Sequence, residues 1–477
     1  IVGHDVVQGE RMGAWLTMEG CPASREGMGE TYLVDDHYGQ AEMPPVRRGT
    51  IARVSYVADL HIHSPYAIST SRDLSLENLA VWAKLKGIDL LATGDFTHPV
   101  WANEIRTKLT DSGDGLFSLD GVKFVLGTEL NCNGRQDGRS RRIHTLVFAP
   151  DLGAMDRIGK AMAGSGASLA GDGRPTVHMT PRELVETLME IDDRCIVIPA
   201  HAWTPWFGVY GSKSGFDSLE ECFGDMLDHV AGIETGLSSD PAMCWTVPEL
   251  DDKALLSFSD AHSLPKMSRE LTVFNGEPSY EGLVKAMAEQ DIAYTVEFFP
   301  EEGKYHYSGH RKCGVSYSPD DVARYGRVCP SCARRMTLGV MQRVAEVGAR
   351  PVETYVDEQG LTRADNGRPP FRSLVSLQQI LSEAMGFGVN TKRVQGAYHE
   401  LVKACGAELT VLLEAPTDDL ASAVPQHGER IVEGIAKVRA GDIFVEPGFD
   451  GQFGKVQVWP DEMAAPRRPL AQSRMEL

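Results

Sequence analysis

The chain has 477 residues, of which 42% are hydrophobic and 24% are charged, a balance typical of a globular protein with a sizeable core and two to four domains. Its net charge of −20 excludes a protein that coats nucleic acid nonspecifically, although a local basic face could still hold phosphates. No run approaches the roughly 18 apolar residues of a membrane span and no secretory signal opens the chain, so we expect a soluble, cytoplasmic protein without a membrane partner.

The first part of the chain divides into an extension and a domain. Residues 1–50 are punctuated by Gly and Pro and are weakly periodic, which predicts an N-terminal extension. Over 51–302, short β-rich runs alternate with amphipathic stretches, the pattern of β/α units around a parallel sheet or barrel. We expect strands within these ranges: 52–60, 87–94, 122–130, 144–150, 195–201, 230–236 and 254–262.

Two segments between these strands have recognisable helix boundaries. Residues 75–87 repeat apolar side chains at helical spacing and end on Gly87, a typical residue just past a helix C-terminus. Residues 180–191 begin with Thr180, Pro181 and Glu183, which together predict a capping box with proline in the first helical position. Both segments predict helices that cover a sheet. The Gly, Ala and Ser residues of 162–173 predict a mobile loop instead.

Side chains that bind metals follow most of the predicted strands. His61 and His63 come just after the first strand, and an extended chain would project both to one face. Two separately hydrogen-bonded histidines would explain this pair equally well. Further candidates come directly after later strands, whereas His144 precedes its strand; the others are Asp95, Glu129, His201, Asp260 and His262. Because a parallel barrel builds its site at the carboxyl ends of its strands, we expect these side chains to converge there.

The eight candidates supply five imidazoles and three carboxylates, which suit divalent ions such as Zn²⁺, Mn²⁺, Fe²⁺ or Mg²⁺. One ion cannot use eight ligands, so we predict two or three ions, bridged by Glu129 or another carboxylate. Such clusters activate water and hold the attacking and leaving oxygens of a phosphate ester. We expect Asp260, His262 and Glu129 to act in catalysis. The alternative is that some of the eight are ordinary polar residues at strand ends.

Residues 303–350 form a basic segment with metal-binding residues. Nine Lys or Arg face three Asp or Glu, a net charge of +6 (9 − 3). His310 and Cys313 form one pair and Cys329 and Cys332 a second, which predicts one structural zinc ion in a small module. A redox-active CxxC is the alternative, and His306 is a weaker candidate for the fourth ligand. Exposed basic residues of this module could contact a DNA backbone, namely Arg311, Lys312, Arg334 and Arg335.

The rest of the chain is helical by its apolar period. Segments 368–388, 390–405 and 429–441 predict helices, and 442–459 is strand-like. We expect a mostly helical C-terminal domain over 351–460 and a tail over 461–477. The other six cysteines are scattered singly, which excludes a disulfide framework for a chain of this size.

Several short motifs resemble the metal motifs of the polymerase and histidinol phosphatase (PHP) superfamily: DLHIHS, TGDFTHP, GTEL, RRIHTLVFAP, IPAHAW and SDAHS. The resemblance implies an α/β fold, a PHP-type distorted (β/α)7 barrel with a trinuclear metal site. Many members have His where this chain has Asp95. An additional acidic ligand of the family is matched to Asp73.

Longer segments are similar to the endonuclease Q family over about 51–460, among them KYHYSGHRKCGVSYSP, CPSCARRMTLGVMQRV and RPPFRSLVSLQQIL. The similarity implies a PHP barrel, a zinc module and a C-terminal domain. It also implies hydrolysis of DNA by metal-activated water on the 5′ side of uracil, hypoxanthine, xanthine or an abasic site. DNA is then the substrate, and DNA replication or repair proteins are further candidate partners.

Two other functions stay open on the residues alone. One is a PHP-type phosphoesterase that acts on a small phosphorylated metabolite, and the other is a non-enzymatic binding module, which the eight retained ligands disfavour. A lesion enzyme needs a pocket for an extruded base. Aromatic residues near the predicted ligands could line it, although each is more often a packing residue: Tyr66, Trp101, Trp203, Trp206 and Phe207.

Overall fold

The computed structural model describes residues 54–460, so the expected extension (1–50) and tail (461–477) lie outside the described residues. Within 54–460, seven strands follow one another around a ring: β1 (Ser55–Asp59), β2 (Leu90–Ala92), β5 (Val122–Gln136), β6 (Arg139–Ala149), β8 (Ile196–Pro199), β9 (Gly232–Glu234) and β10 (Ala254–Leu256).

The ring is closed by backbone pairing outside the named strands. The N–H of Ala202 donates to the carbonyl of Glu234, which joins the end of β8 to β9. Ile62, just past β1, pairs with Ala261, just past β10. The molecule therefore contains the distorted (β/α)7 barrel that the PHP motifs imply.

One strand differs from the parallel arrangement that we expected. β6 is antiparallel to both β5 and β8. β5 and β6 are joined by Asp137 and Gly138, which both have positive φ (50° and 74°), as a two-residue hairpin turn requires. A hairpin reverses the chain, whereas a parallel connection needs a crossover of a dozen or more residues.

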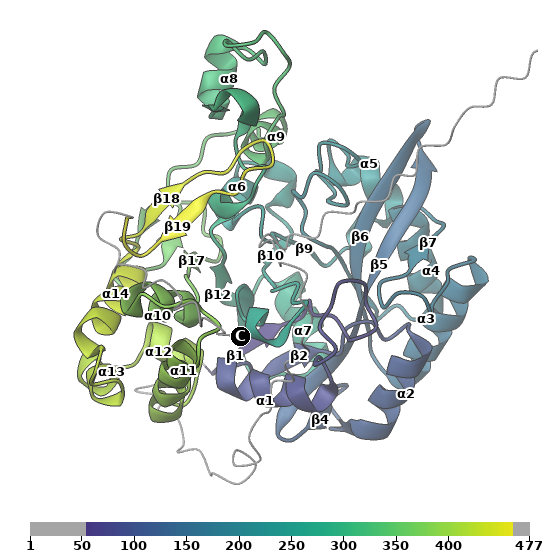
Figure 1. The fold of residues 1–477 in the computed structure, drawn as a ribbon. Helices are drawn as coiled ribbons and strands as arrows, with labels where there is room; N and C mark the ends of the chain where they lie inside the picture. The colour runs from purple at the N-terminus through teal and green to yellow at the C-terminus, as the bar shows by residue number, and fades with distance from the viewer. Residues whose placement is uncertain (1–53, 461–477) are drawn as a thin grey trace, which may run out of the picture.

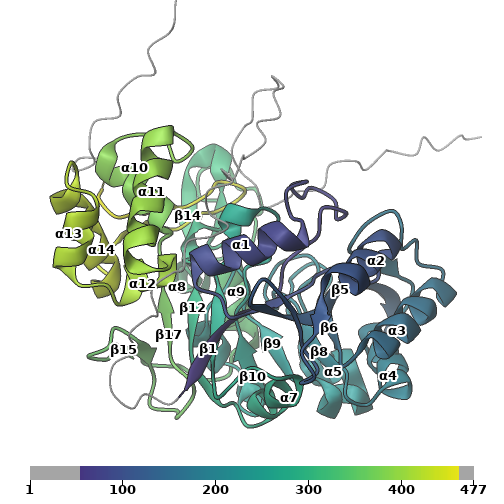
Figure 2. The same ribbon diagram turned by 90° about the horizontal axis from the view of Figure 1, so that it is seen from below.

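Helices cover the barrel from outside (Figure 2). They are α1 (Leu76–Lys86), α2 (Pro99–Lys108), α3 (Leu152–Gly164), α4 (Pro181–Ile191), α5 (Leu219–Phe223), α6 (Pro241–Trp245) and α7 (Tyr280–Ala288). The predicted helix boundaries are confirmed. Gly87 has φ 87° and its N–H donates to Ala83 beyond α1, and Thr180 and Glu183 form the capping box of α4. Short strands extend the sheet at its edge: β3 (Thr110–Asp111), β4 (Phe117–Leu119) and β7 (Thr176–Val177).

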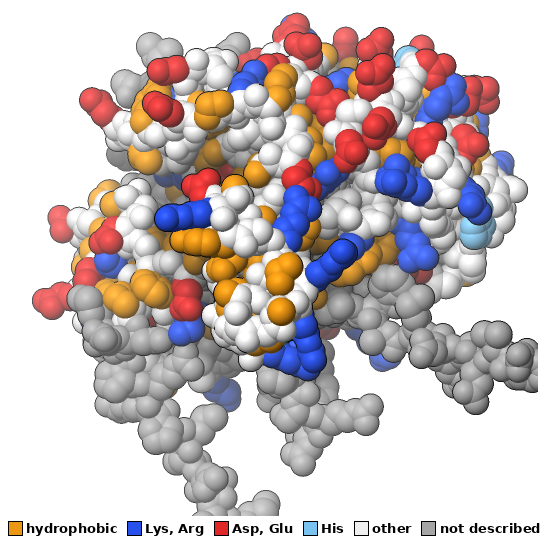
Figure 3. All heavy atoms as spheres, turned by 90° about the horizontal axis from the view of Figure 1, so that it is seen from above, with side chains coloured by type: hydrophobic (Ala, Val, Ile, Leu, Met, Phe, Trp, Pro, Cys, Tyr) orange, Lys and Arg blue, Asp and Glu red, His pale blue; other side chains and the backbone are white. Residues whose placement is uncertain are grey.

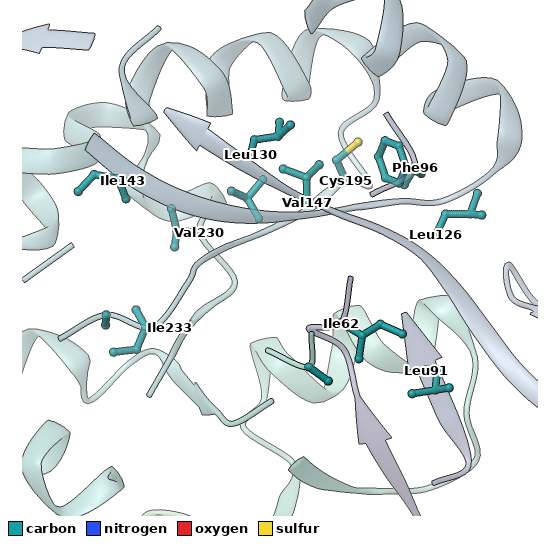
Figure 4. Close-up of a cluster of buried hydrophobic side chains, with 14 of the residues drawn as sticks. Ile62, Leu91, Phe96, Leu126, Leu130, Ile143, Val147, Cys195, Val230 and Ile233 are labelled. Atoms are coloured by element: carbon teal, nitrogen blue, oxygen red, sulfur yellow. The ribbon is translucent and has the colours of Figure 1, made fainter. Parts of the chain in front are cut away.

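Apolar side chains of strands distant in sequence share one buried cluster with side chains of the covering helices, among them α1 and α2. Figure 4 shows Ile62, Leu91, Leu126 and Val147 within one cluster of buried side chains. Beyond β1 the sheet continues through β11 (Leu271–Asn275), β12 (Ile292–Glu297), β17 (Phe371–Ser373), β16 (Thr362–Arg363) and β15 (Tyr355–Val356). No helix among residues 54–460 is long and apolar enough to cross a membrane.

The basic segment and the C-terminal segment stand at different places on the barrel (Figure 1). The basic segment contains β13 (Ser308–His310), β14 (Val315–Tyr317), α8 (Pro319–Tyr325) and α9 (Val340–Val347). The C-terminal segment contains α10 (Leu377–Met385), α11 (Lys392–Cys405), α12 (Glu408–Leu413), α13 (Thr417–Ala423) and α14 (Gly428–Ala440), followed by the hairpin β18 (Phe444–Glu446) and β19 (Lys455–Gln457).

The helix that we predicted over 368–388 was partly wrong. Phe371–Ser373 pairs with β12 as a strand, and the helix begins after Ser376, whose hydroxyl accepts from the N–H of Gln379. The two prolines before Phe371 oppose a helix there, because proline lacks an N–H and restricts the residue before it.

A buried ion pair joins the barrel to the C-terminal helices. Nζ of Lys86, in the last turn of α1, lies 2.6 Å from Oε2 of Glu408 at the start of α12. The hydroxyl of Tyr398 donates to the same carboxylate at 2.8 Å, and the N–H of Leu377 donates to its other oxygen. Because both charges are buried and their partners come from both segments, this pair holds the C-terminal helices in one position on α1.

Candidate metal centre

The site lies at the ends of the barrel strands, where the chain adopts unusual backbone angles. Asp95, His201 and Asp260 follow β2, β8 and β10, and all three have positive φ (47°, 31° and 46°). Side chains other than glycine rarely take such angles, so the surrounding structure must hold them. Gly94 shows how tight the packing is, since a Cβ there would lie 2.4 Å from the carbonyl oxygen of Ile62. His201 and Asp260 belong to two different groups of candidate ligands, and Asp95 contacts His63.

Seven of the eight predicted ligands form three overlapping groups. Within each group the ligand atoms all lie within 4.8 Å of one another. His63 belongs to the first and second groups and Glu129 to the first and third, which makes the groups adjacent. The groups are His61, His63 and Glu129; His63, Asp260 and His262; and Glu129, His144 and His201. Each group could hold one metal ion.

His144 reaches the site although it precedes its predicted strand. In the structure it lies inside β6, paired with Asn131 of β5. Because β6 runs opposite to its neighbours, its first half lies at the end of the barrel where the parallel strands finish. Nδ1 of His144 is 2.6 Å from Oε1 of Glu129 and 3.2 Å from Nε2 of His201.

One nitrogen atom of the site has an environment that suits a metal ion. Nε2 of His61 is buried and has no hydrogen-bond partner among residues 54–460, and it lies 3.5 Å from oxygens of both Glu129 and Asp260. An unpaired polar atom in a buried position is costly, and a divalent ion would satisfy it. Imidazole and carboxylate are also the ligands that zinc, manganese and iron share.

The charges of the site prepare it for a cation. Burial alone would raise the pKa of Glu129, but His144, Arg174 and His61 hold it well below its usual range. Burial, and Arg174 to a smaller extent, lower the pKa of His144 to about 3, against the pull of Glu129. At neutral pH the carboxylate is ionised and this imidazole is neutral, the forms in which both bind metals.

Asp95 lies at the site but outside the three groups. Its Oδ1 is 3.1 Å from Nδ1 of His63, and its Oδ2 accepts from the backbone N–H and the hydroxyl of Ser64 at 2.6 and 2.7 Å. Both oxygens are thus engaged in orienting the loop that carries His63. Asp73 belongs to none of the groups, and its carboxylate accepts a hydrogen bond from the hydroxyl of Ser71.

Two charged residues of the site did not emerge from the sequence. Glu234 ends β9, and its Oε1 is 2.9 Å from Nδ1 of His61. Its position after an apolar strand is the same signal that identified Glu129, so this residue could have been found. Nη1 of Arg174 lies 3.2 Å from Oε2 of Glu129. Arg174 follows a Gly-rich segment and carried no signal.

The aromatic candidates for a base pocket divide into two kinds. Trp101 and Trp203 are fully buried in the core. Phe207 stacks on His144 with ring centroids 4.2 Å apart, and Trp206 beside it is 37% exposed. Tyr66 stacks on His98 and its hydroxyl donates to Glu104. Trp206 is therefore exposed, and Phe207 and Tyr66 are partly buried.

The predicted zinc ligands also come together. One ligand atom each from His310, Cys313, Cys329 and Cys332 lies within 4.8 Å of the others, and Sγ of Cys332 is 3.4 Å from Nδ1 of His310. Backbone N–H groups outweigh the effect of burial and lower the pKa of Cys329 to about 6, which favours the thiolate that binds zinc. His306 is buried outside this group.

Comparisons with known sequences give partial matches. Residues 376–442 match the family model described as the MJ0043 C-terminal domain. The protein MJ0043 of Methanocaldococcus jannaschii is 32% identical over 271 residues, which cover 55% of this chain and only about a third (32%) of that protein. The protein YqxK of Bacillus subtilis is 28% identical over 423 residues, covering 84% of this chain and 98% of YqxK.

Two crystal structures match nearly the whole described fold. The lesion-specific endonuclease PfuEndoQ from Pyrococcus furiosus superposes with a TM-score of 0.74 and 28% identity, over 86% of this chain and 96% of that protein. An endonuclease Q in complex with a 27-mer duplex that has an abasic lesion at the active site gives a TM-score of 0.72 and 28% identity, over 86% and 98%. The chain is therefore similar to endonuclease Q in sequence and fold over 86% of its length.

Proposed function

We propose that this protein is a metal-dependent DNA endonuclease that hydrolyses the phosphodiester on the 5′ side of a damaged nucleotide. The observation that carries the proposal is the cluster of three ligand groups at the strand ends, in a fold similar to an endonuclease Q that holds a lesion duplex at its active site. Uracil, hypoxanthine, xanthine and abasic positions are the proposed lesions. Replication or repair proteins as further partners rest on the family resemblance alone.

We further propose that two or three divalent ions bind through the predicted set, with Asp95 either as a weak ligand or as the support of His63. Ions held there would activate water and stabilise the charge of a phosphodiester during hydrolysis. The ligands are His61, His63, Glu129, His144, His201, Asp260 and His262, with Asp95 beside them.

The exposed ligands indicate the side from which DNA enters. His61, His63 and Glu129 are almost completely buried, whereas the side chain of Asp260 is 26% exposed. Burial opposes its ionisation, but His61, His262 and His63 hold the pKa of Asp260 well below its usual range. We therefore place Asp260 on the side of the site that is open to solvent, where its carboxylate can orient the attacking water.

The basic segment provides the surface that we propose for the DNA backbone. Arg311, Lys312, Arg334 and Arg335 are exposed, and Figure 3 shows basic side chains across the middle of this face. Not every basic residue of this segment is free to bind DNA, because Arg343 donates to Asp217 and Arg350 donates to Asp251. We therefore assign DNA cleavage to the barrel domain (51–302). The basic module (303–350) would fold around one zinc ion and bind DNA, and the C-terminal domain (351–460) would support the other two.

The test uses matched duplexes with and without one deoxyuridine, or one abasic site, and metal-loaded protein. We expect a nick on the 5′ side of the lesion and intact undamaged duplex. Asp260→Asn should abolish nicking and leave DNA binding unchanged, whereas the exposed Asp252→Asn should behave like the wild type. Equal cleavage of both duplexes would exclude lesion specificity. Release of phosphate from small phosphomonoesters, with no nick in DNA, would favour the metabolite phosphoesterase.

A further inference from the structure

Arg174 forms an ion pair with Glu129, a residue shared by two of the three ligand groups. Its Nη1 lies 3.2 Å from Oε2 of Glu129, and its charge also acts on Asp260 and His262. Its side chain is 23% exposed, close to the 26% of Asp260. The guanidinium therefore contacts a buried candidate ligand, while part of the side chain is open to solvent.

Hydrogen bonds hold the backbone around Arg174, which directly follows the segment 162–173 that we predicted to be a mobile loop. The N–H of Gly173 donates to the carbonyl of Tyr66, and Oδ1 of Asp172 accepts from the N–H groups of Ile68 and Arg174. A Cβ on Gly173 would lie 2.4 Å from Oδ2 of Asp95, so the segment lies directly on the site. Beyond it, Pro175 accepts a hydrogen bond from the N–H of Asn131, and Thr176 pairs with β5.

We propose that Arg174 contacts the scissile phosphate and positions it against the ligand groups, an inference that rests on the proposed function of the same site. A phosphodiester carries one negative charge on two free oxygens, and a guanidinium presents paired donors that match such oxygens. Arg174 already contacts a carboxylate of the same charge at the same place. Because its backbone is anchored, little conformational entropy is lost when it engages the substrate.

Arg174 has a second conceivable role, which the experiment separates from the first. If it served only to hold Glu129, its removal would reduce metal binding and activity together. If it contacts the phosphate, its removal leaves the metal content unchanged and weakens the affinity for phosphate. Inorganic phosphate is therefore a suitable probe, because its binding can be measured without DNA cleavage.

The variants are Arg174→Ala, Arg174→Gln and Arg174→Lys, and Arg157→Ala is the matched control on α3, where Arg157 pairs with Asp192. Metal content, the Kd of inorganic phosphate for the metal-loaded protein, and kcat and KM for nicking a deoxyuridine duplex are measured for each. We expect the metal content to stay unchanged in all variants. The Ala and Gln variants should lose about ten- to a hundredfold in phosphate affinity and in kcat/KM, which corresponds to about 1.4 to 2.7 kcal/mol. Lys should restore part of both, and Arg157→Ala should change neither.

Phosphate affinity equal to that of the wild type in both Ala and Gln variants would overturn the proposal, and so would a metal loss that accounts for the loss of activity. Should the wild type fail to nick any lesion duplex, the proposed function is wrong, while the phosphate measurement still decides the role of Arg174. If the Ala variant does not fold, the Gln and Lys variants carry the comparison, because both keep a long polar side chain.

Discussion

Nδ1 of His61 lies 2.9 and 3.1 Å from the two carboxylate oxygens of Glu234, a residue that is completely buried. Oε2 of Glu234 also accepts from the backbone N–H of His201 at 2.7 Å. One carboxylate thus orients two predicted ligands, and it directs Nε2 of His61 toward the ligand groups. Such outer carboxylates fix the tautomer and raise the basicity of a ligating imidazole.

Replacing Glu234 should therefore weaken metal binding without removing a ligand. For Glu234→Gln we expect a loss of about 10- to 100-fold in metal affinity, measured by competition with a chelator of known affinity. Glu190→Gln, an exposed position on α4, is the control. An affinity equal to that of the wild type would show that the contact does not tune His61.

Removal of zinc should loosen the basic segment and leave the barrel folded. With Cys332→Ser we expect about one zinc equivalent fewer and faster proteolysis within 303–350, because this segment has little apolar core without the metal. Cys405→Ser on α11 should alter neither quantity. A full zinc content in Cys332→Ser would contradict the proposed ligand set.

The exposed arginines beside the zinc ligands should bind phosphates. We expect Arg334→Ala with Arg335→Ala to weaken DNA binding and to reduce the slope of log K against log salt by about 2, one unit for each lost phosphate contact. Binding is measured by fluorescence anisotropy over a range of salt concentrations. Arg343→Ala should instead lower the melting temperature, because Arg343 donates to the carbonyls of Tyr210 and Phe216. An unchanged salt slope in the double variant would place the DNA elsewhere.

Removing only one partner of the buried ion pair between Lys86 and Glu408 should lower the free energy of unfolding. For Lys86→Ala we expect a loss of about 3–5 kcal/mol in the free energy of unfolding, because the Glu408 carboxylate would stay buried without its cation. Chemical denaturation checks this value, and the neighbouring exposed Lys84→Ala is the control. Replacing both partners by apolar residues should recover most of the loss. If Lys86→Ala lowered the free energy of unfolding by less than about 1 kcal/mol, the ion pair would contribute no more than a solvent-exposed pair does.

Glu297 should make stability depend on pH. Burial raises its pKa from 4.5 to about 8, while hydroxyl groups of Thr295, Ser257 and Thr235 oppose the shift. Between these values the folded state binds the proton and the unfolded state does not, so the free energy of unfolding falls as pH rises. We expect Glu297→Gln to melt higher than the wild type at pH 8 and to lose this advantage at pH 5. The same melting difference at both pH values would contradict the raised pKa.

Much of the molecule follows from local patterns that the chain carries by itself. Thr180 with Glu183 and Gly87 set helix ends through contacts within one turn, so these boundaries are decided by neighbouring residues. The polar residues after apolar runs predict their own convergence, because parallel strands end at one rim. Each candidate pair of zinc ligands is local as well, since its two residues lie within four positions of the chain.

Tertiary structure alone decided the roles that depend on strand direction and on contacts between distant segments. His144 enters the site because the hairpin at Asp137 and Gly138 reverses β6, and direction depends on how strands pair. Arg174 lies on Glu129 because hydrogen bonds to Tyr66 and Ile68 anchor its segment, which no local periodicity records. From the sequence, the carboxylate of Asp95 could either bind a metal ion or support His63. The folded structure shows that its two oxygens contact His63 and Ser64. Composition and spacing report which groups are available, whereas distances between segments far apart in sequence arise only when the whole barrel packs.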